Sequence, residues 1–542
     1  MTELKQQLQS ALVVEQQSLA QSHIKYSLQH LGFERIDFVD RAHLAIESIK
    51  KRQYQLILCA YELNKGADGF QLFERLHAEH LLKCGTCFVF MSSDNDLQLS
   101  HSIIELNPDD FLLKPFTSRE LEQRLKRVLT KKVALADVFN SLDLNDLAGA
   151  LSRLNDYISK NESPNWLSYL MKMKGEILKD MQDWQQTSDF YESVLKVKPF
   201  QWAQLGLVEC HLHLGRFAEA KNLLSDLIDA RATRLPALEL MTELCELNDK
   251  FDDALFHLKK ATELAPRNVE RQQHLYSLAR ITYDFDSQYQ ASNSIIRNLR
   301  HSVHESPEAY LTAVRANVDY GLTSFNETEV NRLAQQSQHI LDNLKKKFPK
   351  EALNEQIGVA TARIHFLKNE TSKAKQIIES QLEQVNLEQV DNLEDALDMA
   401  KALHELGFHK DSERMFSHIA KIAEDSPNTL FNKFITAEKQ LREEVKSSPK
   451  QLNNDAVNHY TRGNLKEALN AFTSAFKVMP KNPSIALNLL QTMAESPFLD
   501  FEAPEVKVLL DKCQATIDSA TINDEQAERY RRLKQKLQEE RI

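Results

Sequence analysis

The stretch Tyr54-Gln-Leu-Ile-Leu-Cys-Ala60 decides how the first part of the chain folds. Its last five residues are apolar or small, which is typical of a strand buried on both faces of a parallel sheet. Five such runs alternating with five amphipathic patterns predict an α/β fold with a doubly wound, five-stranded parallel sheet. The other runs are 11–14, 36–39, 87–91 and 111–113, and the helical patterns lie near 18–31, 41–52, 69–80, 97–106 and 118–130.

A repeated pattern replaces the strand signal after residue 132. The segments Gly215-Arg-Phe-Ala-Glu-Ala220 and Asp249-Lys-Phe-Asp-Asp-Ala254 place their last alanines 34 residues apart, and Gly463-Asn-Leu-Lys-Glu-Ala468 has the same form. Small residues at these positions let neighbouring helices approach, while bulky ones such as Tyr191 fill the seam between units. Period and pattern resemble tetratricopeptide repeats, which implies an all-α solenoid of helix–turn–helix units with a concave groove.

The repeat pattern is weak in the middle of the chain, where a helical period of 3.6 residues persists and divergent helical pairs are expected. A charged helix at about 523–542 is expected to cap the end of the solenoid, because its few apolar residues share one face. The predicted domains are an α/β domain at 1–132, repeats at 133–300, divergent helical repeats at 301–446, and further repeats with capping helices at 447–542.

The amino-acid composition excludes several classes of protein. The 542 residues include only 12 glycines and 14 prolines, which excludes collagen-like and most turn-dense all-β folds. A net charge of −11 opposes general affinity for nucleic acid or anionic membranes. No apolar stretch is long enough for a membrane span, no secretory signal is visible, and six cysteines are too few for a disulfide scaffold. We therefore expect a cytoplasmic protein.

Four motifs stand in order along the α/β domain. They are Leu12-Val-Val-Glu-Gln-Gln17, Leu56-Ile-Leu-Cys-Ala-Tyr-Glu-Leu63, Phe90-Met-Ser-Ser93 and Asp109-Asp-Phe-Leu-Leu-Lys-Pro-Phe116. In this order and spacing they resemble the receiver domain of two-component response regulators, a flavodoxin-like fold. The resemblance implies a pocket at the strand ends where an aspartate accepts a phosphoryl group, with Mg²⁺ held by acidic residues and a lysine and a hydroxyl on the phosphoryl oxygens.

Within this resemblance, the reactive residue is missing. Ser92 and Lys114 match the hydroxyl and the lysine, but Ala60 stands at the phosphate-accepting position and offers no nucleophile. Glu15 and Gln16 replace the paired acids, which leaves one carboxylate for a cation that normally meets several oxygen ligands. We therefore predict a pseudo-receiver that folds but is not phosphorylated, and a pair between Lys114 and Glu15 that holds the site in one state. The alternative is that these residues are remnants with no present role.

Two neighbouring residues complete this prediction. Glu62 points to the same face as Ala60 in an extended strand, but its different depth argues against its replacing the nucleophile. Phe111 occupies the aromatic position that reports activation in the family, and ordinary packing of an aromatic at a strand end is favoured for it here.

A cysteine pair suggests different chemistry. His77 and His80 precede Cys84-Gly-Thr-Cys87, so four candidate zinc ligands lie close together, and the pair also looks like a redox dithiol. The pair precedes a strand, however, whereas thioredoxin-type pairs begin a helix that lowers the thiol pKa. Ordinary packing or solvent exposure is therefore favoured for these residues, and metal binding or redox chemistry stays the alternative.

Acidic residues recur at one position of the repeats. Glu176, Glu209 and Glu243 stand next to the small-residue position that faces the groove by family analogy, and Glu239 and Glu246 flank this acidic ladder. Charge on a helix is usually a solvated face. The functional interpretation is a groove for a basic or amphipathic helical segment of another protein.

No catalytic motif stands out in the sequence, and no cofactor is expected. The sequence favours a non-catalytic signalling adaptor of two-component type, with a pseudo-receiver and a repeat groove that binds protein partners. It predicts no nucleic-acid or membrane partner and allows a homodimer through the receiver. The alternatives are a phosphorylation-dependent regulator with a non-standard acceptor, and a metal- or thiol-dependent redox protein using Cys84 and Cys87.

Overall fold

The structure is a computed structural model of the chain. It forms two compact units: unit 1 comprises Met1–Arg271 with Arg297–Glu305, and unit 2 comprises Gln272–Ile296 with Ser306–Ile542. The predicted boundaries at 132, 300 and 446 stay predictions, because this division groups the α/β domain with the first repeats. The structure describes residues 9–63, 66–93, 102–103, 105–160, 164–300, 302, 304–383, 392–424, 429–447, 449–501, 503–520 and 522–539.

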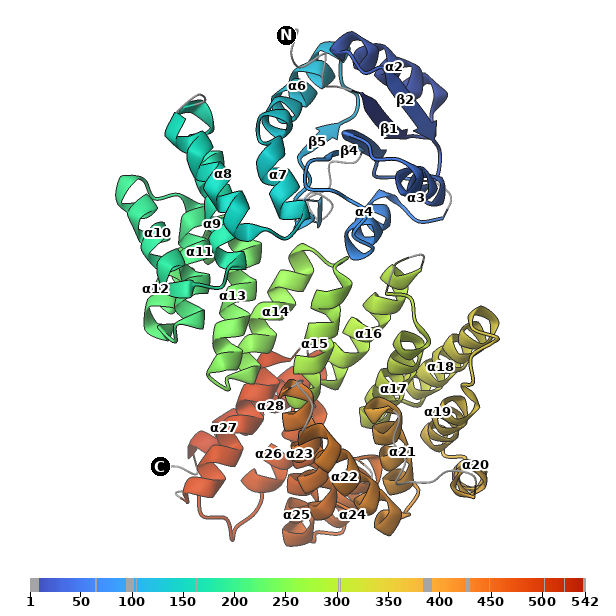
Figure 1. The fold of residues 1–542 in the computed structure, drawn as a ribbon. Helices are drawn as coiled ribbons and strands as arrows, with labels where there is room; N and C mark the ends of the chain where they lie inside the picture. Colours follow the sequence, from blue (N-terminus) through green and yellow to red (C-terminus); the bar gives the residue numbers. More distant parts are fainter. Residues whose placement is uncertain are drawn as a thin grey trace. The chain divides into compact units, whose positions relative to one another are not determined.

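The first part of unit 1 is a five-stranded parallel sheet with the strand order β2-β1-β3-β4-β5 (Figure 1). Each step of the prediction from apolar runs is confirmed, since every predicted run became a strand. Strand β3, which ends at Ala60, lies between β1 and β4 and is buried along its whole length. The strands are β1 (Ser10–Val14), β2 (Arg35–Val39), β3 (Leu56–Ala60), β4 (Cys87–Ser92) and β5 (Asp110–Leu113).

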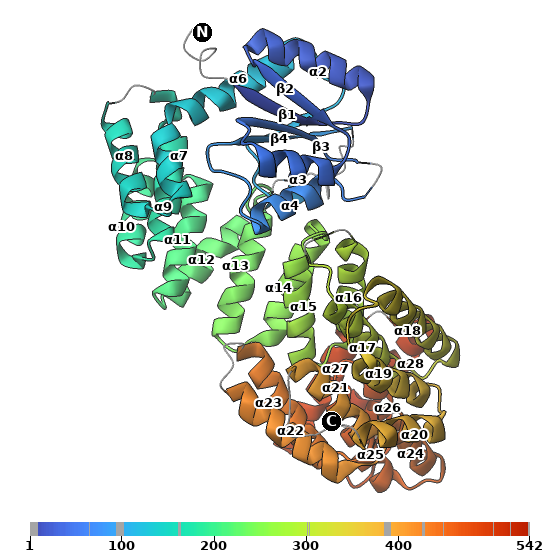
Figure 2. The ribbon, with the colours of Figure 1, turned by 45° about the vertical axis from the view of Figure 1, so that its right-hand side comes forward.

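Helices cover both faces of the sheet (Figure 2). Helices α2 (Ser18–Leu31) and α6 (Ser118–Ala134) pack on one face against alternate strand residues, and α3 (Ala42–Lys51) and α4 (Gly69–Ala78) cover the other. Strand residues alternate between two apolar cores, as the two-residue period of a strand requires. The helix predicted near 97–106 falls mostly outside the described residues.

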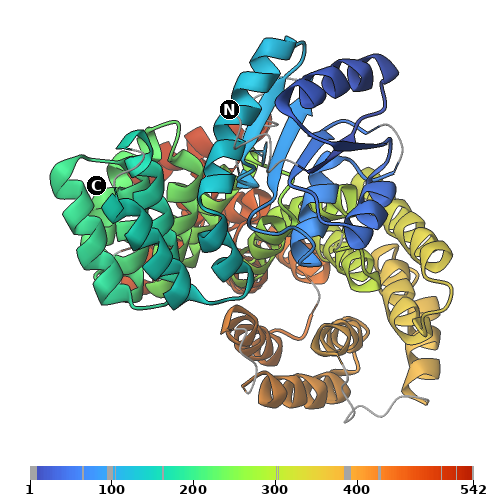
Figure 3. The ribbon, with the colours of Figure 1, turned by 45° about the horizontal axis from the view of Figure 1, so that its top comes forward.

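Antiparallel helix pairs follow the sheet in unit 1, and those of the first repeats lie side by side (Figure 3). Ala220 and Ala254 are fully buried, as the repeat pattern predicts. Tyr191 fills a seam so tightly that a Cβ at Gly175 would lie 2.6 Å from its hydroxyl oxygen. The helices are α7 (Ala136–Asp143), α8 (Leu147–Lys160), the 3-10 turn η1 (Pro164–Trp166), α9 (Leu167–Asp180), α10 (Trp184–Val197), α11 (Gln201–His213), α12 (Phe217–Asp229), α13 (Arg234–Leu247) and α14 (Phe251–Leu264).

Helices α15 (Val269–Ile281) and α16 (Phe285–Leu299) contribute residues to both units, and the described part of the rest of unit 2 is helical. The divergent middle region forms helix pairs, as its period predicts. The last helix buries Tyr530, Leu533 and Leu537 in a core shared with its neighbours, as expected for a cap. The helices are α17 (Pro307–Thr323), α18 (Glu327–Lys347), α19 (Asn354–Leu367), α20 (Thr371–Leu382), α21 (Leu393–Glu405), α22 (His409–Glu424), α23 (Thr429–Glu444), α24 (Pro449–Thr461), α25 (Leu465–Val478), α26 (Pro483–Ala494), α27 (Pro504–Ser519) and α28 (Asp524–Glu539).

Within the described residues, no helix combines the length and the apolar character that crossing a bilayer requires.

Candidate functional site

The predicted pocket forms at the carboxyl ends of the strands. Glu15 directly follows β1, Ala60 ends β3, Ser92 ends β4 and Lys114 directly follows β5. The strand register brings the last two together, because the Lys114 backbone N–H donates to the Ser92 carbonyl oxygen at 2.8 Å. Residues from four separate segments therefore meet at one edge of the sheet, as the parallel topology requires.

Glu15 and Lys114 form the ion pair that the sequence predicts. The Lys114 Nζ lies 2.5 Å from Glu15 Oε2. The other carboxylate oxygen, Oε1, accepts the backbone N–H groups of Gln16 at 2.9 Å and Gln17 at 3.0 Å. Glu15 is only 2% exposed, so both of its oxygens are used within the protein. The contact is present, and whether it fixes a signalling state stays a prediction.

Glu62 forms a hydrogen bond with the hydroxyl group of the pocket, a contact that the sequence did not predict. The Ser92 Oγ donates a hydrogen bond to the Glu62 carboxylate. Glu62 itself is exposed, whereas the Ala60 methyl group is 1% exposed. The signal that could have found this contact is the two-residue spacing, which places Glu62 and Ala60 on the same side of an extended chain.

The pocket does not fit the magnesium ion that the receiver resemblance implies. Mg²⁺ requires near-octahedral oxygen coordination. Ala60 supplies no side-chain oxygen, and the oxygens of Glu15 already accept hydrogen bonds from Lys114 and two backbone N–H groups. Across the described part of the chain, no group of three or more His, Cys, Asp or Glu side chains is arranged to hold a metal ion.

The aromatic residues around the pocket are held in place. Phe111 is partly buried against the core beneath α3 and α4, which agrees with the packing role favoured for it. Tyr61, which directly follows Ala60, is 4% exposed, and its ring lies 5.9 Å from that of Phe90 in an edge-on arrangement.

The cysteine pair lacks the features of a redox or metal site. Cys87 is buried in β4, and burial raises the pKa of its thiol well above the usual range. Partial desolvation, followed by the nearby Asp143, raises the pKa of Cys84 to about 11. The His77 ring lies against that of Phe73, with centroids 4.5 Å apart and planes tilted by 51°, and His80 lies past the end of α4 with a positive φ of 52°. Thiols with raised pKa values are poor nucleophiles at neutral pH.

Cations of the same chain neutralise much of the acidic ladder. Lys179 Nζ lies 2.9 Å from Glu176 and 2.8 Å from Glu209, so it bridges two repeats. The Arg271 Nε donates to Glu239 at 2.8 Å. A basic partner would have to replace these contacts, and the groove interpretation stays a prediction. Two further ladder residues, Glu243 and Glu246, also take part in polar interactions.

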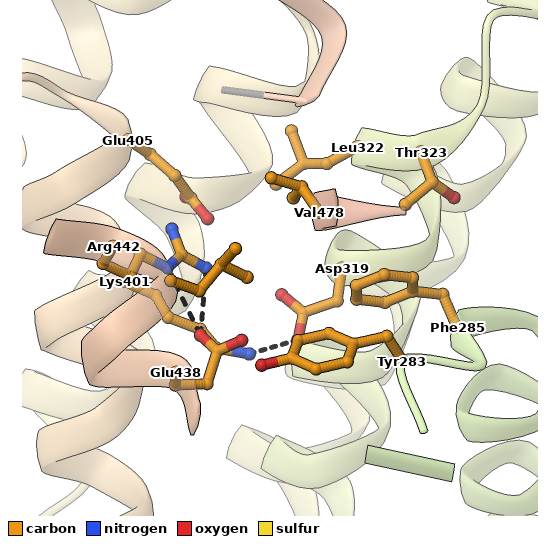
Figure 4. Close-up of a pocket in the computed structure, with 11 residues that line it drawn as sticks. Tyr283, Phe285, Asp319, Leu322, Thr323, Lys401, Glu405, Glu438, Arg442 and Val478 are labelled. Atoms are coloured by element: carbon orange, nitrogen blue, oxygen red, sulfur yellow. Dashed lines mark hydrogen bonds and ion pairs between the residues drawn. The ribbon is translucent and has the colours of Figure 1, made fainter. Parts of the chain in front are cut away.

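Unit 2 contains a small charged cavity that the sequence analysis did not single out (Figure 4). Lys401 Nζ donates to Asp319 at 2.7 Å on one side, and Arg442 lies 3.2 Å from Glu438 on another. Its volume of about 30 Å³ has room for ordered water and none for an organic substrate. We therefore treat this cavity as part of the interior of unit 2.

Comparisons with known proteins agree with this geometry. Residues 11–126 match the family model of the response regulator receiver domain. The transcriptional activator protein IrlR of Burkholderia pseudomallei (strain 1026b) is 27% identical over 173 residues, which cover 31% of this chain and 72% of that protein. The family match is confined to residues 11–126, so it identifies a domain and not the function of the whole protein.

Solved structures resemble separate parts of the chain. The signal receiver domain of a modulated diguanylate cyclase from Desulfovibrio desulfuricans G20 is 24% identical, covers 23% of this chain and 98% of its own, and has a TM-score of 0.21. A tetratricopeptide repeat protein from Parabacteroides merdae ATCC 43184 is 13% identical, covers 56% of this chain and 96% of its own, and has a TM-score of 0.23. The sheet topology and the family match establish a receiver domain, and the repeated helix pairs that follow it resemble those of tetratricopeptide proteins.

Proposed function

We propose that this protein is a non-catalytic adaptor of two-component signalling, in which a receiver that cannot be phosphorylated is joined to a repeat solenoid that binds proteins. The observation that carries the proposal is Ala60: a methyl group stands at the end of β3, where the receiver family has its phosphate-accepting carboxylate. Without a nucleophile there, output has to come from binding surfaces. The proposed location is the cytoplasm.

The state of the other pocket residues supports the same conclusion. A phosphoryl group would need the Lys114 ammonium and the Ser92 hydroxyl, but these are paired with Glu15 and Glu62. Glu62 is the candidate for a non-standard acceptor because it touches Ser92. Its exposed carboxylate lies beyond the buried strand end and contacts no described cation, which opposes that alternative.

Treatment with acetyl phosphate followed by mass spectrometry of the intact protein tests this proposal. The wild-type chain should gain no phosphoryl group. The matched variant is Ala60→Asp, which restores a carboxylate at the end of β3; a phosphoryl adduct on this variant alone would assign the lost reactivity to position 60. A phosphoryl adduct on the wild-type pocket would show a working receiver, and Glu62→Gln would then identify or exclude Glu62 as the acceptor.

A further inference from the structure

The receiver carries an acidic surface next to its pocket, and a turn of the repeats in the same compact unit lies against it. We define the receiver rim as Tyr61, Asp68, Phe70, Gln71 and Glu105, and the repeat turn as residues 265–271. The contacts between these two surfaces lie within unit 1, as do the supporting contacts of Glu239, Asn298 and Arg300.

Arg267 makes the central contact. Its Nη1 donates to the Tyr61 hydroxyl oxygen at 2.6 Å, and its Nη2 donates to Asp68 Oδ2 at 2.5 Å. The guanidinium carbon also lies 4.7 Å from the centre of the Phe70 ring. Withdrawing an arginine from water is costly unless hydrogen-bond acceptors meet its planar donors. In Arg267, two donor nitrogens are hydrogen-bonded and one face of the guanidinium lies against Phe70. Such a match is typical of a specific binding surface.

A second arginine reinforces this contact. Glu105 accepts hydrogen bonds from the side chains of Asn268 and Arg271. Arg271 is 3% exposed, and its Nε also donates to Glu239 at 2.8 Å. Glu239, which flanks the acidic ladder, therefore orients an arginine toward the receiver. This role differs from the predicted one, in which Glu239 lines a groove for a partner.

Gln71 anchors the start of α4 to the same part of the repeats. Its Nε2 donates to the Arg300 carbonyl oxygen at 2.7 Å, while its own backbone N–H donates to Asp68 at 3.0 Å as part of a capping box. The Asn298 side chain donates to the Pro266 carbonyl oxygen at 3.2 Å and ties this segment to the repeat turn. The rim is thus held by side chains and by backbone carbonyl groups.

We propose that the receiver rim is a binding surface for an arginine-bearing turn. Its occupant is this chain's own repeat turn, so the repeats bind the receiver domain of the same chain. Tyr61 follows Ala60 directly, which places the rim one residue from the degenerate pocket. The inference deepens the proposed function, because it names the partner of the pseudo-receiver. Carboxylates on the rim and arginines on the turn supply the charge complementarity.

Hydrogen–deuterium exchange on the full chain tests the proposal. Asp68→Asn keeps an N-cap residue for α4 but removes the ion pair with Arg267, and Arg267→Gln removes it from the other side. In both variants the amides of 69–78 and 265–271 should exchange about tenfold faster, because a charge-assisted hydrogen bond between partly buried side chains is lost. Arg216→Gln is the control, since the Arg216 side chain hydrogen-bonds only Gln185 among the described contacts and its loss should leave both segments unchanged.

Three results would overturn the inference. Unchanged exchange in both variants would mean that the contacts do not hold the rim. Equal acceleration in β3 would mean that the arginine supports the receiver fold and not its docking. Protection of the rim that rises with protein concentration would assign the occupant to a second copy. Failure here is separable from failure of the proposed function, because phosphorylation of the wild-type pocket is measured independently of this exchange.

Discussion

The receiver pocket and the buried ion cluster of unit 2 are both groups of carboxylates around cations, yet they differ in how the charges are shared. We define the buried ion cluster as Arg363, Lys401, Asp319, Asp398 and Glu405. Arg363 is 2% exposed and lies 2.7 Å from Asp319, 2.7 Å from Asp398 and 2.5 Å from Glu405. In the receiver pocket, Lys114 has the single carboxylate partner Glu15 among the described contacts, and its side chain is 19% exposed.

This difference separates charges that stabilise the fold, in the ion cluster, from charges that stand where the receiver family has its reacting groups. In the cluster, one guanidinium joins three helices and three carboxylates, and Asp319 also contacts Lys401, so removal of Arg363 leaves buried charge behind. In the receiver pocket, the charges sit at the open ends of strands, where the family places reacting groups, and they pair one to one. We expect mutations in the cluster to affect stability strongly and mutations in the pocket to affect it less.

The largest effect is expected for Arg363→Met. It removes the cation that three buried carboxylates share and leaves Glu405 with no described cation, which should destabilise unit 2 by about 3–5 kcal/mol. Urea unfolding followed by circular dichroism measures this loss, while fluorescence of the three tryptophans, which all lie in unit 1, should be affected less. Arg414→Ala, an exposed arginine 3.9 Å from Asp411, is the control and should cost little. A loss below about 1 kcal/mol for Arg363→Met would remove the distinction drawn above.

A smaller effect is expected in the receiver pocket. Glu15→Gln and Lys114→Met each break the buried pair and should cost about 1–3 kcal/mol, measured by urea unfolding with tryptophan fluorescence. The double variant should cost less than the sum, because the two side chains interact directly. Lys126→Met, an exposed lysine on α6, serves as the control. Strict additivity would mean that the pair does not act as a unit.

The receiver domain and the buried ion cluster should also respond to pH in opposite directions. Burial raises the pKa of Glu74, next to the receiver rim, to about 7. The nearby Arg267 lowers this pKa, but its effect is smaller than that of burial. Since the folded state holds this proton more tightly, its contribution to stability falls as pH rises from about 4.5 to 7. Burial alone would raise the pKa of Asp319, but Lys401 and Arg363 outweigh it and hold that pKa below its usual range, so its contribution is lost only in acid.

Two variants separate these trends. Glu74→Gln should raise the melting temperature of unit 1 by a few degrees at pH 8 and leave it nearly unchanged at pH 5. Asp319→Asn should reduce the loss of unit 2 stability that accompanies acidification below about pH 4. Melting curves followed by tryptophan fluorescence and by circular dichroism provide the two readouts. The same pH trend in both variants would contradict the assignment.

The smallest effect concerns the cysteines. Cys84 is exposed with a raised pKa, and Cys87 is buried, so iodoacetamide at neutral pH should label Cys84 slowly and Cys87 only after unfolding. Mass spectrometry after timed labelling measures both rates. Rapid labelling of both thiols in the folded chain would revive the redox alternative.

Much of the fold could be predicted from local patterns. The run ending at Ala60 and its neighbours identified all five strands, because a strand buried on both faces must be apolar throughout. Burial of Ala220 and Ala254 followed from the repeat period. The pair of Glu15 and Lys114 was also predictable, since both follow strands that end at one edge of a parallel sheet.

The remaining contacts depend on segments far apart in the chain. Arg267 meets Asp68 across 199 residues, and Arg363 meets Asp319 across 44, and neither spacing carries a local signal. The acidic ladder shows the same limit: the sequence aligned its carboxylates, but Lys179 and Arg271 reach them only through the stacking of the repeats.

The sequence by itself determined the parallel sheet, the helical repeats and the missing carboxylate at position 60, because each follows from a periodicity or from the identity of one residue. Only the tertiary structure decided which charges are paired, that Glu62 takes the Ser92 hydroxyl, and that the repeat turn rests on the receiver. The physical reason is that hydrophobic periodicity acts over a few residues, whereas hydrogen bonds and ion pairs depend on where the folded chain brings distant side chains within about 3 Å of each other.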